Sequence, residues 1–272
     1  MNKPLTSLSL APSSDRRRDA WYWRLFATGV AFILFAMGCM VLRILAFMPR
    51  RWRGADTLRQ KQRARVAISR SMRMFISFLV RTGVMTFEFN GAERLGRPGQ
   101  MIIANHPSLL DVVFLLAQVR HANCIIKHGL IENPITYGPV SAAGYISNET
   151  SLDMFEASVK SLTDGETLVV FPEGTRSQPG QAPVFHRGAC AIALRGARVV
   201  TPVIIRHASN SLAKGQPWYH IPKQRLHYVL DVGTDIDPQH WADHHSAPIA
   251  GRKMNEFLHT YFRSELGLNG PT

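Results

Sequence analysis

Residues 101–117 read MIIANHPSLLDVVFLLA, and they reveal the architecture because they join a strand to a helix across a polar turn. The first four residues form a short apolar run followed by turn chemistry, which predicts a buried strand. Pro107 suits the first position of a helix, where no backbone N–H is needed, and residues 109–116 continue that helix. His106 is therefore expected at the mouth of the strand–helix junction, with Asp111 one turn into the helix.

The pair His106 and Asp111 can act as a base only in one geometry. On a straight helix, side chains five residues apart point about 140° away from each other, at about 100° per residue. The two can meet only because His106 lies outside the helix and folds back over its first turn. A carboxylate on one imidazole nitrogen then fixes the tautomer and leaves the other nitrogen as a general base near neutral pH.

Taken alone, this pair has two interpretations. His106 could cap the helix while Asp111 is a polar residue of its first turn, and for an isolated His-x4-Asp pattern this simpler interpretation is favoured. For the catalytic interpretation, the sequence holds no Gly-x-Ser-x-Gly motif that would carry a covalent acyl group. A dyad without that nucleophile suits direct activation of a substrate hydroxyl.

A second motif overturns the simpler interpretation. Residues 169–177 read VVFPEGTRS, which is another buried strand ending in a polar turn. The guanidinium of Arg176 can fork onto phosphate or carboxylate oxygens, and Gly174 lets the backbone approach a ligand closely. Both motifs follow strands, so we expect them at the same edge of an α/β sheet, where ligands of such folds bind.

The two motifs together carry a resemblance to a known family. NHPSLLD at 105–111 and FPEGTR at 171–176 resemble the first and third sequence blocks of glycerolipid acyltransferases, the lysophosphatidate acyltransferases in particular. The resemblance runs from about residue 87 to about residue 205 and includes a fourth block at 200–203. It implies that His106 and Asp111 are catalytic. It also implies that six residues bind substrate, namely Glu173, Gly174, Thr175, Arg176, Lys127 and Arg187.

The second block of the family matches only in part. Lys127, the Asn-Pro…Gly run after it and a Gly-Tyr-Ile run stand where the family has them. However, His128-Gly129 replaces the usual Glu-Leu, and Ser147-Asn148 stands where an arginine for the acceptor phosphate is expected. The resemblance therefore implies lysophosphatidate as the acceptor, with a lyso-lipid that lacks the phosphate as the alternative.

The resemblance implies acyl transfer from a thioester to a hydroxyl. His106, oriented by Asp111, would take the proton from a lyso-lipid hydroxyl that attacks the thioester of acyl-CoA or of an acyl carrier protein. Backbone N–H groups after Pro107 or in the Gly174 turn would stabilise the oxyanion, while Glu173 would orient Arg176 or the acceptor backbone. The fatty chain would lie in an apolar groove facing the bilayer. No metal or bound organic cofactor is expected.

Charge and apolar residues near the N-terminus predict a membrane lipid as partner. The chain has 272 residues and a formal charge of +13, so it should seek anionic partners. Residues 25–42 are apolar, carry no charged side chain and lie between aromatic flanks, which predicts either a spanning helix or a helix half-embedded in one leaflet. A helix at 57–82 follows, and between residues 50 and 73 the only acid stands among nine basic residues at 50, 51, 53, 59, 61, 63, 65, 70 and 73. Such a helix suits an anionic leaflet.

We expect three parts along the chain. They are a disordered basic tail at 1–18, a membrane-associated helical segment at 19–83 and an acyltransferase catalytic domain at 84–272. The expected location is the inner membrane, with the catalytic domain facing the cytoplasm. Three cysteines without paired spacing are consistent with that reducing compartment.

The catalytic part alternates between strand and helix patterns. Strands are predicted near 84–90, 100–104, 122–127, 167–171, 199–205 and 225–232, and helices near 108–117, 151–162, 188–195 and 248–265. This alternation predicts an α/β fold with a mixed or mostly parallel sheet flanked by helices, preceded by the N-terminal membrane-binding helical segment.

Two other classes of function remain as alternatives. An inactive relative that only holds anionic lipid is disfavoured by the intact His106, Asp111, Glu173 and Arg176. A nucleic-acid binder is disfavoured because no nucleic-acid module signature occurs and the apolar segment would be unexplained. The histidines at 240, 244 and 245 lack a His-Glu-x-x-His pattern, so they are interpreted as surface residues rather than metal ligands.

Overall fold

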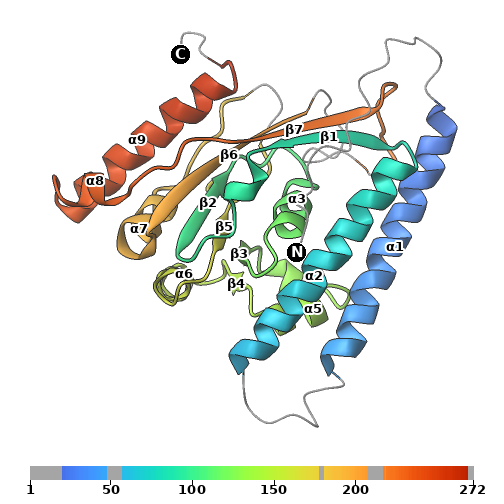
Figure 1. Cartoon of the computed structure of the whole chain (residues 1–272), viewed down its shortest axis with the longest axis horizontal. Helices are drawn as coiled ribbons and strands as arrows, with labels where there is room; N and C mark the ends of the chain where they lie inside the picture. The colour runs from blue at the N-terminus through green and yellow to red at the C-terminus, as the bar shows by residue number, and fades with distance from the viewer. Residues whose placement is uncertain (1–19, 48–56, 178–180, 208–216, 218, 269–272) are drawn as a thin grey trace.

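The computed structural model describes residues 20–47, 57–177, 181–207, 217 and 219–268, so the predicted tail at 1–18 lies outside the described residues. Two N-terminal helices lead into alternating strands and helices (Figure 1). The strands are β1 (Met85–Asn90), β2 (Gln100–Ala104), β3 (Asn123–Ile126), β4 (Ile146–Ser147), β5 (Leu168–Val170), β6 (Val199–His207) and β7 (Leu226–Val232). The helices are α1 (Trp21–Phe47), α2 (Thr57–Arg81), the 3-10 turn η2 (Ala92–Arg94), α3 (Asp111–Gln118), α4 (Gly129–Glu132), α5 (Tyr137–Ala143), α6 (Ser151–Thr163), α7 (Arg187–Gly196), α8 (Gln239–Ala242) and α9 (Ala247–Glu265).

The strands form one mixed sheet in the order β1-β7-β6-β2-β5-β3-β4. The neighbours β6, β2, β5, β3 and β4 are parallel, while β7 is antiparallel to β6 and parallel to β1. The predicted α/β class with a mostly parallel sheet is therefore confirmed. Parallel neighbours end at the same edge, so the segments after β2, β3, β4 and β5 meet there.

Helices cover both faces of the sheet (Figure 1), and the central strand β2 contributes to both cores. Met101 and Ile103 pack in the cluster that also holds residues of α6, α7 and α9. Ile102 and Ala104 pack in the cluster on the other face, with α2 and α3. A parallel strand that is buried on both faces has a continuous apolar sequence, which explains the run MIIA at residues 101–104.

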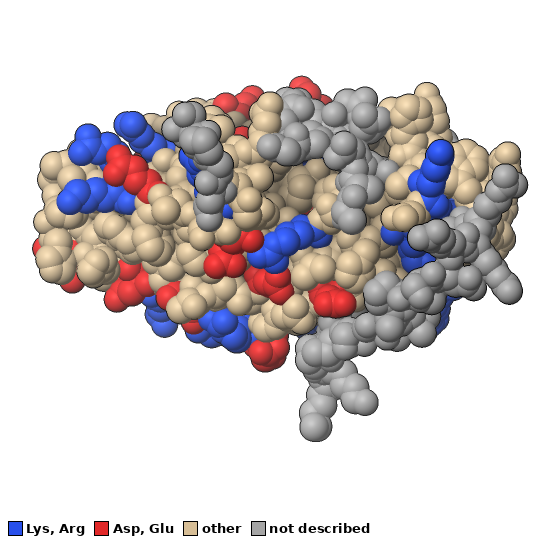
Figure 2. Space-filling view, turned by 90° about the horizontal axis from the view of Figure 1, so that it is seen from above, with Lys and Arg blue, Asp and Glu red and all other residues tan. Residues whose placement is uncertain are grey.

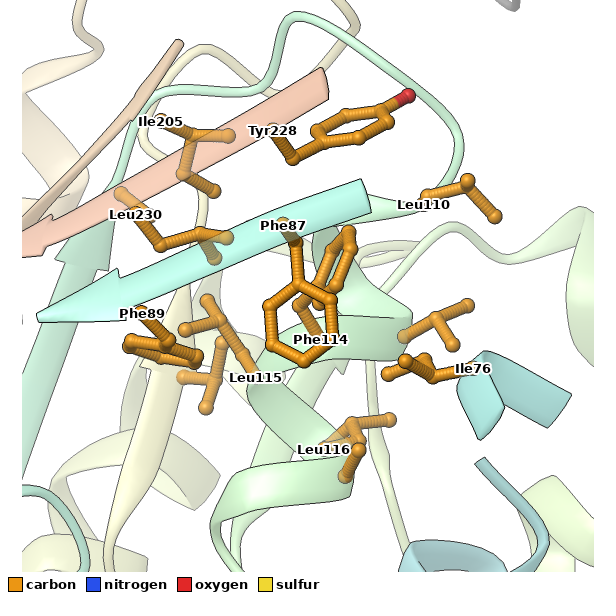
Figure 3. Packing of buried hydrophobic residues seen from close by; sticks show 14 of the residues in the cluster. Ile76, Phe87, Phe89, Leu110, Phe114, Leu115, Leu116, Ile205, Tyr228 and Leu230 are labelled. Atoms are coloured by element: carbon orange, nitrogen blue, oxygen red, sulfur yellow. The ribbon is translucent and has the colours of Figure 1, made fainter. Parts of the chain in front are cut away.

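The cluster on the α3 face joins the N-terminal helices to the sheet. Phe114 of α3 lies between Phe87 of β1 and Tyr228 of β7, with ring centroids 5.2 Å from each (Figure 3). Ile76 of α2 and Ala31 of α1 belong to the same cluster. The segment predicted to bind the membrane and the catalytic part therefore share one core.

The start of α3 differs from the prediction. The helix begins at Asp111, so the prediction that Pro107 opens it, with Asp111 one turn inside, was wrong. The N–H of Ser108 donates to Asp111 Oδ2 at 2.7 Å, and the N–H of Leu110 donates to Ser108 Oγ at 3.1 Å. These bonds from backbone to side chain compete with helical bonds and hold the preceding residues in a turn.

The six strands and four helices predicted for the catalytic part are all present, with bounds within a few residues. The sequence patterns did not predict β4, α4, α5 or α8. β4 has two residues, and α4 and α8 have four each, so these elements are too short to establish a hydrophobic period.

α1 and α2 pack in opposite directions, since the indole N–H of Trp23 at the start of α1 donates to the carbonyl of Thr82 after α2 at 2.9 Å (Figure 1). The small residues Ala27 and Ala31 of α1 are buried. Its large apolar residues include nine that are exposed, namely Tyr22, Trp23, Phe26, Ile33, Leu34, Met37, Met40, Val41 and Ile44. Within the described part of the chain, Trp21–Ile44 is the one segment long and apolar enough to cross a membrane.

Both ends of α1 are bonded to the catalytic part. Near its start, the buried guanidinium of Arg24 donates to the carbonyls of residues 222, 223 and 224 at 3.0, 2.7 and 3.0 Å. Near its end, Arg43 donates to the carbonyl of Pro134 at 2.6 Å. α1 therefore lies along the catalytic part and does not project from it.

Among the described basic residues of α2, Arg65 and Arg73 bind inside the protein. Arg65 forms an ion pair with Glu166 at 2.6 Å, and Arg73 donates to the carbonyl of Ala117 at 2.6 Å. Burial tends to raise the pKa of Glu166, but the bonds from Arg65, Ser161 and Asn123 hold that pKa below its usual value. On the face shown in Figure 2, Lys and Arg stand among Asp and Glu and do not form one patch. Arg65 and Arg73 thus attach α2 to the catalytic part through an ion pair and a hydrogen bond.

Candidate active site

His106 and Asp111 form the predicted dyad at the carboxyl end of β2. Nδ1 of His106 lies 2.8 Å from Oδ2 of Asp111, and the carboxylate is fully buried, while the imidazole is 19% exposed. Asp111 also accepts from the N–H and the hydroxyl of Ser108, at 2.7 Å each. A carboxylate held by these donors favours the proton on Nδ1, which leaves Nε2 as the basic nitrogen. The interpretation of His106 as a helix cap is wrong, because Leu110 occupies the position before the helix.

The third-block loop holds the backbone of His106 on both sides. The N–H of His106 donates to Glu173 Oε1 at 2.8 Å, and its carbonyl accepts from the N–H of Ser177 at 2.8 Å. The hydroxyl of Ser177 closes the ring of contacts by donating to the same Glu173 oxygen at 2.8 Å. The buried Glu173 thus ties the loop after β5 to the loop after β2.

Burial sets the electrostatics of Glu173. Removal from water raises the pKa of its carboxyl above the usual value, and the nearby charge of Asp111 acts in the same direction. The bonds from His106 and Ser177 oppose this rise without cancelling it. The resemblance implied that Glu173 orients Arg176 or the acceptor backbone. The structure instead gives its carboxylate the N–H of His106 as a partner.

Phe171 packs against the imidazole. The rings of Phe171 and His106 are stacked, with centroids 4.4 Å apart and an angle of 29° between their planes. With Nδ1 bonded and one face covered, the imidazole has little freedom to rotate. The arrangement can abstract a proton at Nε2 without first reorganising.

Gly174 makes the turn of the third block possible. Its φ is +63°, and a Cβ at this position would meet the ring of His186 at 3.5 Å. Gly174 and Thr175 are exposed, so backbone of this turn faces the solvent beside the dyad. His186 also precedes α7, which places Arg187 beside the same turn.

The sequence of this chain matches known proteins. Residues 86–206 match the family model described as Acyltransferase. The 1-acyl-sn-glycerol-3-phosphate acyltransferase of Helicobacter pylori (strain J99) is 30% identical over 169 residues, which cover 60% of this chain and 70% of that protein. The chain belongs to the acyltransferase family.

Another curated relative matches a smaller part of this acyltransferase chain. The protein of the same name from Borreliella burgdorferi is 27% identical over 131 residues, covering 46% of this chain and 52% of its own length. The chain spans about a third to a half of the length of the first curated relatives it matches. The crystal structure of the 1-acyl-sn-glycerophosphate (LPA) acyltransferase PlsC from Thermotoga maritima has a TM-score of 0.65 at 20% identity, covering 92% of this chain and 97% of that one. That likeness shows the fold.

The fold brings three of the predicted site residues into contact, and the others lie farther along the same edge of the sheet. His106, Asp111 and Glu173 are joined by hydrogen bonds. Arg176 follows β5, the strand next to β2 at about 4.8 Å, whereas Lys127 follows β3, about 10 Å from β2. Lys127 and Arg187 are exposed at this edge.

Sequence reasoning missed Ser108, Phe171, Ser177 and Tyr228 as parts of the acyltransferase site. Ser108 had a signal, because Ser-x-x-Asp before an apolar run is the pattern of a capping box. The structure forms half of that box, in which the Asp111 carboxylate reaches back to the Ser108 N–H. Tyr228 had no local signal, since it lies 120 residues from Ser108 in the chain.

The second block of the acyltransferase places His128 against a carboxylate. The N–H of His128 donates to Oδ1 of Asn148 at 2.9 Å. Nδ1 of His128 lies 3.0 Å from the Glu149 carboxylate and 3.2 Å from the hydroxyl of Ser147. The end of β4 therefore presents a carboxylate close to the position where the family has an arginine.

An apolar cavity of about 250 Å³ lies between the N-terminal helices and the sheet. α1, α2, α3 and α5 supply most of its lining, including Phe35, Met72, Phe75, Val113, Leu116 and Val140. Leu109 and Leu110 also line it, and they belong to the loop between His106 and Asp111. The cavity thus extends to the loop that carries the dyad.

Proposed function

We propose that this chain is an O-acyltransferase that moves a fatty acyl chain from a thioester to the hydroxyl of a lyso-lipid, 1-acylglycerol-3-phosphate, giving phosphatidate. The observation that carries the proposal is the 2.8 Å hydrogen bond between His106 and the fully buried Asp111. It is the arrangement that a hydroxyl-activating base requires. Membership of the acyltransferase family supports the same reaction.

The reaction follows from this geometry. Nε2 of His106 takes the proton of the acceptor hydroxyl while the oxygen attacks the thioester carbonyl, and Asp111 stabilises the imidazolium that forms. The N–H of Gly174 donates to the carbonyl of Phe171, so the N–H groups of Thr175 and Arg176 in the same turn are the proposed donors to the oxyanion. The tetrahedral intermediate then collapses, the carbon–sulfur bond breaks, and the departing thiolate takes the proton from His106. An ester and a free thiol are the products, and the acyl donor is the co-substrate.

The apolar cavity is the proposed site for the fatty chain. Its lining is apolar and it reaches the loop of Leu109 and Leu110, so a chain held there would bring its carbonyl toward His106. Removing the chain from water is favourable by about 0.8 kcal/mol for each CH2 group. The cavity also keeps bulk water from the thioester side of the reaction.

The exposed face of α1 supports a half-embedded position in one leaflet of the membrane. A helix that spans a bilayer carries its ends to opposite sides, but Arg24 and Arg43 bond both ends of α1 to the catalytic part. A full span would therefore draw the polar catalytic part into the hydrocarbon, at a high cost in free energy. We propose the cytoplasmic face of the inner membrane as the location, with lipid and an acyl-CoA or acyl carrier protein as partners.

A second candidate is the same reaction on a lyso-lipid without the phosphate. The observation that favours it is the Glu149 carboxylate at the end of β4, paired with His128. A carboxylate there repels a phosphate dianion and suits a neutral or ammonium-bearing headgroup. For the phosphate acceptor, the cations of Arg176, Lys127 and Arg187 are the proposed ligands.

The test measures acyl transfer by membranes that contain the full chain, with labelled acyl-CoA and acyl carrier protein as donors. The acceptors are lysophosphatidate and a panel of lyso-lipids without the phosphate, and His106→Ala is the control. Transfer to lysophosphatidate that is lost in the control supports the first candidate. Transfer only to another acceptor supports the second, and Asn148→Arg should then raise kcat/KM for lysophosphatidate. Absence of transfer to every acceptor would contradict both.

A further inference from the structure

Tyr228 of β7 is a fully buried tyrosine whose hydroxyl points at the catalytic loop. Its ring packs on Phe114 with centroids 5.2 Å apart, and its O–H donates to Ser108 Oγ at 3.2 Å. Figure 3 shows the hydroxyl at the end of the ring directed away from the apolar cluster, on the side of Leu110. A buried hydroxyl requires a hydrogen-bond partner, and Ser108 is that partner for Tyr228. A phenylalanine would fill the same space without this requirement.

The direction of each bond is fixed by the hydrogen-bonding capacity of Ser108. A serine hydroxyl has one proton and two lone pairs. The proton is committed to Asp111 Oδ1 at 2.7 Å, and one lone pair accepts the N–H of Leu110 at 3.1 Å. Tyr228 must therefore donate to the remaining lone pair. Burial and the charge of Asp111 raise the pKa of Tyr228, so its hydroxyl keeps the proton it donates.

We propose that Tyr228 is a positioning residue of the active site, acting on His106 through Ser108 and Asp111. This inference rests on the proposed acyl transfer for its catalytic meaning. Each donor in the chain points toward the carboxylate, and hydrogen bonds in such a chain polarise one another. The chain spreads the charge of Asp111 away from His106, which limits how strongly the imidazole retains the proton that it must later return to the thiolate.

Four titratable groups surround this chain of bonds. They are His106 and Asp111 of the dyad, Glu173 of the neighbouring loop, and His207 of β6, whose ring centroid lies 5.2 Å from that of Tyr228. Tyr228 is distinguished by the hydrogen bonds that connect its hydroxyl through Ser108 to Asp111. A purely structural hydroxyl would affect stability, whereas this path also links it to the protonation of His106.

The experiment follows the protonation of His106 directly. Diethyl pyrocarbonate modifies the neutral imidazole, which is 19% exposed here, and mass spectrometry of the His106 peptide gives the rate at each pH. The proteins are the full wild-type chain, Tyr228→Phe, Ser108→Ala and the double variant. Tyr261→Phe is the matched control, since Tyr261 lies in the cluster on the opposite face of the sheet and its hydroxyl bonds the backbone of Thr234.

The expected result has three parts. In Tyr228→Phe the pH midpoint of modification moves upward, because Asp111 then holds the imidazolium more strongly, while Tyr261→Phe matches the wild type. The double variant has the same midpoint as Ser108→Ala, since the path is already broken. In acyl transfer, Tyr228→Phe lowers kcat about two- to tenfold, the effect of one ordinary hydrogen bond, and leaves KM nearly unchanged.

Two results would overturn the inference. One is a midpoint for Tyr228→Phe that coincides with that of the wild type. The other is an equal shift by Tyr228→Phe with and without Ser108, which would show an action that bypasses the serine. If the wild type transfers no acyl group, the proposed function fails, and the modification midpoints still decide the role of Tyr228.

Discussion

The dyad and the outer face of α1 differ in whether their side chains have partners within the protein. Asp111 is fully buried and accepts three hydrogen bonds, and the backbone of His106 is bonded on both sides. Ile33 and Met37 of α1 are instead 62% and 57% exposed. The polar groups of the site have their hydrogen-bond partners within the protein, whereas the apolar face is left to an outside partner, which is lipid in our proposal. Catalysis and membrane binding should therefore be separable by substitution.

Replacement of Asp111 by Asn should have the largest effect on activity. The amide keeps the shape but removes the charge that fixes the tautomer and stabilises the imidazolium, so kcat should fall about 10³-fold or more. Acyl transfer measures this loss, and flotation with liposomes should show unchanged membrane binding. A variant that lost both properties would contradict the separation.

Replacement of Arg65 by Met tests what fastens α2, the neighbour of α1, to the catalytic part. It leaves the partly buried Glu166 without its cation, which should lower the free energy of unfolding by about 3–5 kcal/mol. Because the pKa of Glu166 is lowered in the fold, this stabilisation exists above its usual value of 4.5 and is lost as the pH falls below it. Thermal unfolding of both proteins at several pH values measures the effect.

The double variant Arg65→Met, Glu166→Gln is the control for that prediction. It removes both charges, so it should recover most of the lost stability. A loss as large as that of the single variant would mean that packing of the arginine stem, and not the ion pair, fastens α2.

Replacement of Ile33 by Asp should weaken membrane binding and spare the site. The loss of buried apolar area is worth about 2 kcal/mol, or about 30-fold in partitioning. Flotation with anionic liposomes measures it. Phe257→Asp on α9 is the matched control, since Phe257 is also an exposed apolar residue, at 42%. Equal losses for both variants would argue against α1 as the membrane face.

Replacement of Glu173 by Gln should have the smallest effect, and one that depends on pH. Burial raises the pKa of Glu173, so its contribution to stability is full below the usual value of 4.5 and is lost as the pH rises through the raised value. The glutamine variant should therefore gain stability relative to the wild type as the pH rises from 4.5 to 8. Its amide oxygen can still accept the His106 N–H, so activity should fall less than tenfold. A constant difference in unfolding temperature would contradict the assignment.

The strands of the sheet and the dyad could be predicted from the sequence because their signals are local. The apolar run at 101–104 and the five-residue spacing of His106 and Asp111 are both read within a few residues. The start of α3 could not be placed, since the bonds between Ser108 and Asp111 compete with the helix and propensity does not count them. α4 and β4 were missed because such short elements take their shape from their neighbours.

Burial decided which charged residues serve the fold and which serve the site. From the pattern alone, Arg65 and its basic neighbours look equivalent, yet Arg65 is turned inward to Glu166. Glu173 looked like a partner of substrate, yet its carboxylate holds the backbone of His106. In both cases the partner is distant in sequence, so no local pattern could reveal it.

The sequence by itself determined the α/β class and the meeting of the two motifs at one edge of the sheet, and it singled out His106 as the candidate base. These depend on residue types at short spacings, which the chain carries wherever it folds. Only the tertiary structure decided that Tyr228 reaches Ser108 and that both ends of α1 rest on the catalytic part. Those contacts depend on the order and register of strands, which are set by packing between segments far apart in the chain.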